Sequence, residues 1–248
     1  MLLTSARVRR ALGAVCVALV LGATAACGEA TDSDAKESPA KERPSTKESP
    51  SSSPATSPAA GKEGLEKLIV TKVKGFEVTV AAAGEVRSSG AVTASKAACQ
   101  PIADLVGTVA AGSPSDTVYR QLVAASEPED MTASGVLVGL SSYPRAGAAQ
   151  ALAEVGKAVS ACGGGFTTTS ADGEDTYSGV TAEDGPTGLD ESLAFELTGS
   201  LDGEKIPLKY ALVRAGDTVA LFYAMNPFDP ASADIAPTVT AAQIARLK

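Results

Sequence analysis

The chain has 248 residues, a formal net charge of −8, no histidine and no tryptophan. The acidic balance disfavours nucleic-acid binding, because phosphate recognition needs clustered Lys and Arg. The absence of histidine excludes Ser-His-Asp and Cys-His catalysis and any zinc site that needs imidazole, and the shortage of aromatic residues disfavours a base- or sugar-stacking platform.

The first 26 residues are typical of a bacterial export signal. An apolar run from Ala11 to Val20 follows a basic start and precedes the small residues of Thr24-Ala25-Ala26. The run is too short for a permanent span of about 20 residues. An ordinary secretory signal cut after Ala26 is the alternative, but Cys27, Gly28 and the polar tract after them favour a lipoprotein signal. Its removal changes the net charge from −8 to −11, since it contains no acid and three basic residues: Arg7, Arg9 and Arg10.

Cys27 is therefore the predicted lipidation site. A diacylglyceryl group carries two acyl chains, such as palmitate, and two chains suffice for stable anchoring. We expect a monomer held at the extracellular face of the cell membrane by this group. Residues 27–64 are predicted to be the lipidated Cys followed by a disordered linker. Ser, Pro, Lys and Glu dominate this segment, and no aromatic or branched aliphatic residue occurs from 28 to 64.

Residues 65–248 are predicted to form one globular domain with 13 Lys and Arg against 22 Asp and Glu. Alternating or β-branched apolar residues predict strands at 68–73, 76–80, 118–124, 136–140, 166–170 and, less clearly patterned, 176–181. Residues 84–90 read as a turn or loop. A helix starting near Pro101 is indicated by apolar residues at i, i+3, i+4 and i+7, namely Ile102, Leu105, Val106 and Val109.

A second helix opens near Tyr143-Pro144-Arg145 and ends at Gly163-Gly164-Gly165. Its apolar face is the most regular in the chain, with spacings of 4, 3, 4 and 3 for Ala148, Leu152, Val155, Val159 and Cys162. Three alternating strands follow, centred on 193–197, 206–212 and 219–225, and separated by Asp202-Gly203 and Ala215-Gly216 turns. A last helix is predicted at 237–247, with Thr240, Ile244 and Leu247 on one side.

Cysteine usage predicts one disulfide. Cys16 lies in the export signal and Cys27 carries the lipid, so Cys99 and Cys162 remain in the domain of an exported chain. The alternatives are two buried free thiols or, less plausibly with only two ligands, a metal site. The predicted fold class is α+β: an antiparallel sheet with a C-terminal three-strand meander, two to three helices packed on one face, and this disulfide.

Several segments resemble those of actinobacterial secreted lipoproteins with a PknH-like extracellular sensor domain. They are the Tyr143-Pro144-Arg145 start and Ala-rich helix, Cys162-Gly-Gly-Gly-Phe166, residues 189–195 with Asp-Glu-Ser-Leu, residues 213–219 with Val-Arg-Ala-Gly-Asp, and the Gln243-containing final helix. The likeness covers about 118–248. It implies an extracytoplasmic α+β domain with a ligand cleft. None of these segments is a catalytic motif, so no site residue is transferred.

Two groups of carboxylates are candidate sites. Asp172, Glu174 and Asp175, with Glu183 and Asp184 further on, could bind calcium, but the spacing matches no EF-hand loop and solvated turns are the favoured interpretation. Asp190, Glu191 and Glu196 could serve glycosidase-type acid/base chemistry, but residues five apart on a strand face opposite sides, so surface charge is favoured.

Arg145 and Arg214 could each bind a ligand carboxylate or phosphate, and an ion pair or solvation is the alternative. We therefore predict no catalytic residue, no metal and no cofactor. The favoured function is a non-enzymatic, lipid-anchored binding or sensor-like lipoprotein that holds a small or apolar ligand, or an envelope protein, between sheet and helices. The alternatives are a cell-envelope enzyme using carboxylate acid/base chemistry and a purely structural envelope lipoprotein.

Overall fold

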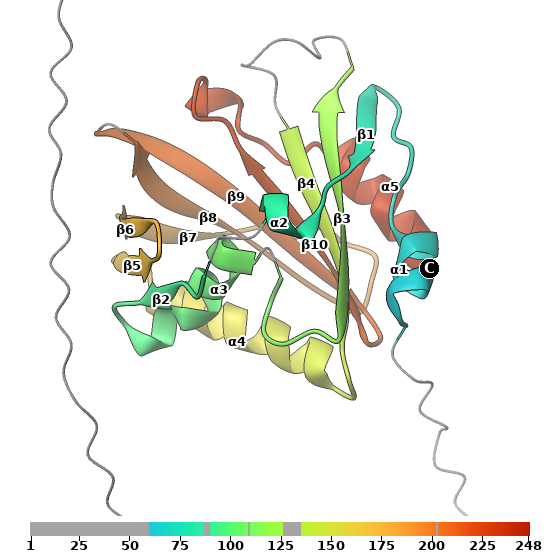
Figure 1. Cartoon of the computed structure of the whole chain (residues 1–248), viewed down its shortest axis with the longest axis horizontal. Helices are drawn as coiled ribbons and strands as arrows, with labels where there is room; N and C mark the ends of the chain where they lie inside the picture. Colours follow the sequence, from blue (N-terminus) through green and yellow to red (C-terminus); the bar gives the residue numbers. More distant parts are fainter. Residues whose placement is uncertain (1–59, 87–89, 109, 126–134, 202) are drawn as a thin grey trace, which may run out of the picture. The chain divides into compact units, whose positions relative to one another are not determined.

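A computed structural model describes residues 60–248 except 87–89, 109, 126–134 and 202 (Figure 1). Cys27, the predicted signal and most of the predicted linker lie outside these residues. The larger of two sheets has seven strands in the order β1-β3-β4-β10-β9-β8-β7, and every neighbouring pair is antiparallel. Its strands are β1 (Phe76–Val80), β3 (Asp116–Ala124), β4 (Gly135–Ser142), β7 (Gly179–Glu183), β8 (Glu191–Leu201), β9 (Glu204–Ala215) and β10 (Thr218–Met225).

The smaller sheet has three strands in the order β2-β5-β6, namely β2 (Thr93–Ala94), β5 (Phe166–Ser170) and β6 (Gly173–Tyr177). The helices of the described residues are α1 (Lys62–Leu68), α2 (Ala83–Val86), α3 (Gln100–Thr108), α4 (Gly147–Ala161) and α5 (Pro237–Leu247), with short 3₁₀ turns η1 (Ala97–Cys99) and η2 (Pro230–Ser232). The predicted α+β class, the three-strand meander β8-β9-β10 and the C-terminal helix are thus confirmed.

Both faces of the large sheet are buried. Along β10, Val219 and Leu221 belong to one core, whereas Ala220 and Phe222 between them belong to a second core. Successive side chains of a strand point to opposite faces, so the two cores lie on the two sides of the sheet. We call these sides the disulfide face, covered by α3 and α4, and the Gln243 face, covered by α1 and α5 (Figure 1).

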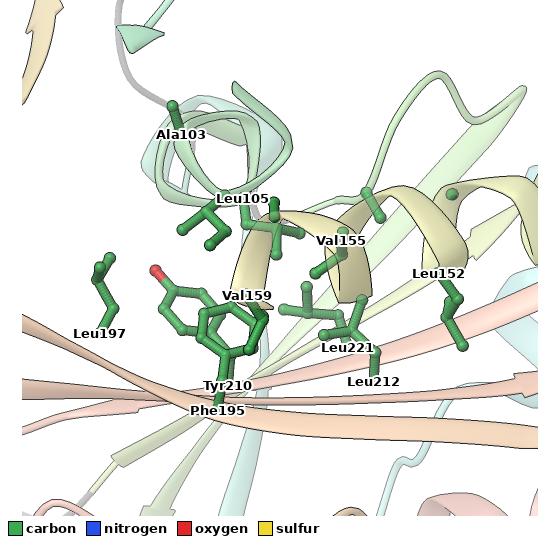
Figure 2. Close-up of a cluster of buried hydrophobic side chains, with 14 of the residues drawn as sticks. Ala103, Leu105, Leu152, Val155, Val159, Phe195, Leu197, Tyr210, Leu212 and Leu221 are labelled. Carbon is green, nitrogen blue, oxygen red and sulfur yellow. The ribbon is translucent and has the colours of Figure 1, made fainter. Parts of the chain in front are cut away.

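The disulfide face carries the predicted helix pair. The predicted apolar positions of α4 are buried: Ala148, Leu152, Val155, Val159 and Cys162. Figure 2 shows Leu152, Val155 and Val159 pointing at Phe195, Tyr210, Leu212 and Leu221 of the sheet. Cys99 and Cys162 form the predicted disulfide, with a Cα–Cα distance of 5.9 Å, and both are fully buried. The bridge connects the start of α3 to the end of α4.

The Gln243 face adds a helical layer that the sequence did not predict. The helices predicted on one face are α3 and α4, and α5 lies on the other face together with α1. The buried residues of α5 are Val239, Gln243 and Ile244. Of the predicted side, Ile244 is buried and Leu247 packs against the same core, whereas Thr240 is only partly buried and the burial of Val239 and Gln243 was not predicted. Gln243 joins the two helices: its Oε1 accepts the Val70 N–H at 2.7 Å and its Nε2 donates to the Leu68 carbonyl at 3.1 Å.

Two predicted strands are wrong in detail. Residues 68–73 do not form a strand, because Leu65 of α1 and Ile69 directly after it are both buried in the core of the Gln243 face. The helix α1 begins at Lys62, inside the predicted linker. The predicted strand 176–181 is two strands, β6 and β7, which pair in different sheets and are separated at Ser178. The predicted loop at 84–90 overlaps the short helix α2.

Candidate functional site

The predicted acid/base carboxylates belong to two separate groups of ion pairs. Asp190 and Glu191 both contact Arg214, at 3.3 Å and 3.2 Å, and Asp190 Oδ2 also accepts the Gly216 N–H at 2.8 Å. These contacts tie the start of β8 to the β9–β10 turn. Arg214 therefore forms ion pairs within the protein, which was the predicted alternative to binding a ligand. Asp190 and Glu191 are both engaged in these pairs.

Glu196 belongs to the second group. It contacts Lys209 at 3.0 Å, and Lys209 also contacts Glu183 of β7. Burial lowers the pKa of Lys209, but its hydrogen bonds to Glu183 and Glu196 outweigh burial and raise that pKa above its usual value. The group links β7, β8 and β9 by cross-strand pairs. Glu183 and Lys209 also line a cavity of about 250 Å³, together with Asp184 and Asp234.

The acidic turn residues do not converge. Asp172 lies at the β5–β6 turn and Asp175 on β6, whereas Glu183 ends β7 in the other sheet. Within the part of the chain that the structure describes, no group of three or more Cys, Asp or Glu side chains has the geometry of a metal site. No helix within the same ranges is long and apolar enough to cross a membrane.

Arg145 lies at a cavity of about 340 Å³ beside the start of α4. Ala146, which precedes the helix, has a φ of 47°, and no side chain caps the helix. Below it, the Tyr143 hydroxyl donates to the Ala111 carbonyl at 2.6 Å, and burial raises the pKa of Tyr143 to about 12. Arg145 itself is exposed, so the cavity presents one solvated cation.

A more apolar hollow lies where the meander extends beyond α3 and α4. It measures about 260 Å³ and is enclosed by the ends of β8, β9 and β10 and by β6. We call it the meander hollow; its lining residues are Asp175, Thr176, Tyr177, Gly199, Ser200, Leu201, Ile206, Leu208, Met225 and Pro227. It differs in position from the predicted site: the space between α4 and the sheet is filled by the side chains seen in Figure 2.

Two of the residues that line the meander hollow, Leu201 and Met225, are exposed apolar side chains. Leu201 is 52% exposed, Met225 39% and Phe228 61%, and they are three of the four large exposed hydrophobic residues in the described part of the chain. Phe228 follows the lining residue Pro227 and is held by Asn226, whose Oδ1 accepts the backbone N–H groups of Phe228 at 3.1 Å and Asp229 at 3.0 Å. Contiguous exposed apolar surface commonly marks a binding site.

One tyrosine lines the meander hollow, and two others lie in or against the core beside it. Tyr177 lines it directly, and a Cβ at Gly199 would lie 3.6 Å from the Tyr177 ring and 3.0 Å from Leu208 Cδ1, so glycine permits this close approach. Tyr210 stacks on Phe195 and contacts the ring of Tyr223, each with centroids 5.0 Å apart. Burial raises the pKa of Tyr210 and of Tyr223 and that of Tyr177 to about 12. These phenols are neutral at physiological pH, so Tyr177, the tyrosine that lines the hollow, presents no charge to it.

Sequence reasoning did not find the meander hollow. Ile206, Leu208 and Met225 were predicted as one side of alternating strands, which is correct, and such residues usually enter a core. The signal that was present is the length of the meander: β8 and β9 have 11 and 12 residues, whereas α4, which covers them, begins and ends over only part of that length.

No protein-family model and no curated protein matches the chain. Among solved structures, it is similar to the extracellular domain of PknH from Mycobacterium tuberculosis, with a TM-score of 0.46 and 14% sequence identity over 76% of this chain and 95% of that chain.

Proposed function

We propose that this protein is a non-enzymatic, sensor-like binding lipoprotein, anchored by a diacylglyceryl group on Cys27 at the extracellular face of the membrane. The observation that carries the binding function is the meander hollow with its exposed apolar residues Leu201 and Met225. Burying such residues against the apolar part of a ligand is favourable by about 25 cal/mol per Å². The ligand is a small or apolar molecule, and the protein acts as a monomer.

The state of the carboxylates supports a role without catalysis. A glycosidase needs two carboxyl groups that face each other across a substrate, about 5–9 Å apart. In this chain Asp190 and Glu191 are paired with Arg214, and Glu196 is paired with Lys209. We therefore favour binding over the carboxylate-enzyme alternative.

Binding can be tested with a neutral apolar fluorophore, N-phenyl-1-naphthylamine. We expect saturable fluorescence enhancement with the wild-type protein and a Kd weakened roughly fivefold to tenfold in Leu201→Ser and Met225→Ser, because each substitution removes apolar contact area. Val80→Ser is the matched control, since Val80 is 71% exposed on the edge strand β1 and does not line the hollow. Equal binding by all three variants would place the probe elsewhere and refute the site.

Anchoring can be tested separately. Cys27→Ser removes the only thiol that could accept the diacylglyceryl group at the predicted cleavage point. We expect the variant to leave the membrane fraction and metabolic labelling with a radioactive fatty acid to be lost, because a single export signal without acyl chains gives no stable anchor. Ala26→Ser, one residue away, should keep the label. Unchanged membrane fractionation of Cys27→Ser would contradict anchoring through this residue.

A further inference from the structure

The charged side chains around the meander hollow are arranged with one sign toward it. Asp175 lines the hollow, and none of its described lining residues is Lys or Arg. Side chains on β6 alternate, so Asp175 lies on the same face as Tyr177. Asp175 also contributes, after burial, to the raised pKa of Tyr177, which is consistent with its charge lying close to that ring.

The nearest hairpin adds to this asymmetry. On β9 the even-numbered residues Ile206 and Leu208 point to the hollow's side of the sheet, so Glu204 shares that side and Lys205 points to the other. In the ladder, Glu204 is opposite Leu201 and Lys205 is opposite Ser200. Two carboxylates, Asp175 and Glu204, thus share the side of the hollow, and the neighbouring ammonium group does not.

The size of the hollow limits what can enter. Its volume of about 260 Å³ is just below the range of about 300–1,000 Å³ typical of small-molecule sites. That volume suits one alkyl chain or one ring rather than a lipid with two chains. Its lining joins the apolar residues Ile206, Leu208 and Met225 to the carboxylate-bearing residue Asp175. An apolar lining with a charged group at its edge is the arrangement that an amphiphile requires.

We propose that the meander hollow binds the chain of a single-chain amphiphile whose head group is cationic or neutral, and that Asp175 discriminates against anionic head groups. This inference rests on the proposed function, because it names the ligand class of the same site. Like charges brought together in a partly desolvated site repel, and opposite charges attract. The net charge of the domain, with 13 basic and 22 acidic residues over 65–248, acts in the same direction.

The test uses three probes with one alkyl chain, each below its micelle concentration: octyltrimethylammonium, octyl glucoside and octyl sulfate. Calorimetry or ligand-observed NMR gives each Kd. We expect octyltrimethylammonium to bind at least as tightly as octyl glucoside, and octyl sulfate to bind about fivefold more weakly than octyl glucoside at low salt. The difference should shrink as salt is raised, because exposed charges are screened.

Two variants assign the charge effect. Asp175→Asn should remove the discrimination against octyl sulfate, whereas Glu174→Gln should keep it, because Glu174 lies on the same strand and points to the opposite face. Both residues are exposed, so neither change should unfold the protein, and melting temperatures check this. The inference would be overturned if the wild-type protein bound the three probes with equal Kd values. It would also be overturned if Asp175→Asn and Glu174→Gln changed the discrimination against octyl sulfate equally.

A chain-length series separates this failure from a failure of the proposed function. Lengthening the alkyl glucoside from heptyl to octyl should tighten Kd about fourfold if the added methylene is buried. A chain-length effect without head-group selectivity would refute the charge inference and leave the apolar site standing. The absence of any chain-length effect, with Leu201→Ser binding like wild type, would refute both.

Discussion

The two faces of the large sheet are held to their helices by different chemistry. On the disulfide face, Cys99–Cys162 links α3 to α4 across 63 residues of sequence. On the Gln243 face the described residues include no cysteine, and α5 is joined to the end of α1 by hydrogen bonds that involve Gln243 and Arg246; Arg246 Nε donates to the Leu68 carbonyl at 3.0 Å. One face is closed covalently and locally, and the other is closed by polar contacts between the two ends of the domain.

This difference predicts different consequences of mutation. A disulfide stabilises mainly by restricting the unfolded chain, so its loss leaves native contacts intact. The bonds of Gln243 exist only in the folded state, and its loss leaves the buried Val70 N–H without an acceptor. The faces also differ in composition: all five tyrosines lie in or against the core of the disulfide face and none in that of the Gln243 face.

The largest effect is expected from opening the disulfide. The double substitution Cys99→Ser and Cys162→Ser should destabilise the domain by about 4 kcal/mol, which for a domain of this size lowers the melting temperature by roughly 10 °C. Calorimetry measures the change, and wild-type protein unfolded in reductant should match the variant. An unchanged melting temperature, or labelling of both wild-type cysteines by a thiol reagent after denaturation without reductant, would contradict the role of the bridge.

A smaller effect is expected from removing the polar contact on the other face. Gln243→Leu keeps a similar volume but removes both hydrogen bonds, so it should cost about 2 kcal/mol and lower the melting temperature by roughly 6 °C. Gln150→Leu is the control, because its Nε2 donates to Glu154 on the exposed side of α4. If the two variants are equally stable, the Gln243 contact does not hold α1 and α5 together.

The smallest expected effect on stability comes from the buried tyrosines, and it is seen only at high pH. Burial raises the pKa of Tyr143 and Tyr177 to about 12 in the folded protein, against about 10 when unfolded. A raised folded-state pKa means that this stabilisation is complete below pH 10 and is lost as the pH rises to about 12, because the unfolded chain then ionises first.

Absorbance of phenolate near 295 nm tests that prediction. We expect the buried tyrosines of the folded protein to ionise near or above pH 12 and those of the protein unfolded in urea to ionise near pH 10. The melting temperature should decrease as the pH is raised from 10 to 12. The double Tyr143→Phe and Tyr177→Phe variant should lose part of the fall. Ionisation of the folded protein at the pH of the unfolded chain would show that the disulfide face is not closed around these rings.

The sequence predicted what local patterns determine. The 4-3-4-3 spacing of α4, the alternation of β8, β9 and β10, and the assignment of Cys99 to Cys162 depend on neighbouring residues or on elimination, and the structure confirms them. The run Leu68-Ile69-Val70 was predicted to be a strand because β-branched residues favour strands. Its partner is instead α5, some 175 residues away, and no local pattern reveals such a contact.

The second helical layer was detectable in part. Ala211, Val213, Ala220, Phe222 and Ala224 lie between the predicted core positions of the meander and are themselves apolar. Strands apolar at both alternations are buried on both faces, so these residues carried the signal that a second layer exists. Gln243 hid that layer, because a glutamine on a helix is ordinarily interpreted as exposed, and only its partners on α1 show that it is fully buried.

The position of the meander hollow could not be predicted: the length of β8 and β9 indicates that strand ends extend beyond α4, but not which ends the helices leave uncovered. Its central claim, that an apolar chain enters beside Met225, is tested most directly by NMR of protein labelled at the methionine methyl groups. The chain has three methionines, so the Met225 signal can be assigned by Met225→Leu. With octyl glucoside below its micelle concentration, we predict a saturable shift of the Met225 methyl signal that Leu201→Ser weakens and Val80→Ser does not. A Met225 signal that stays in place while other signals move would contradict the account.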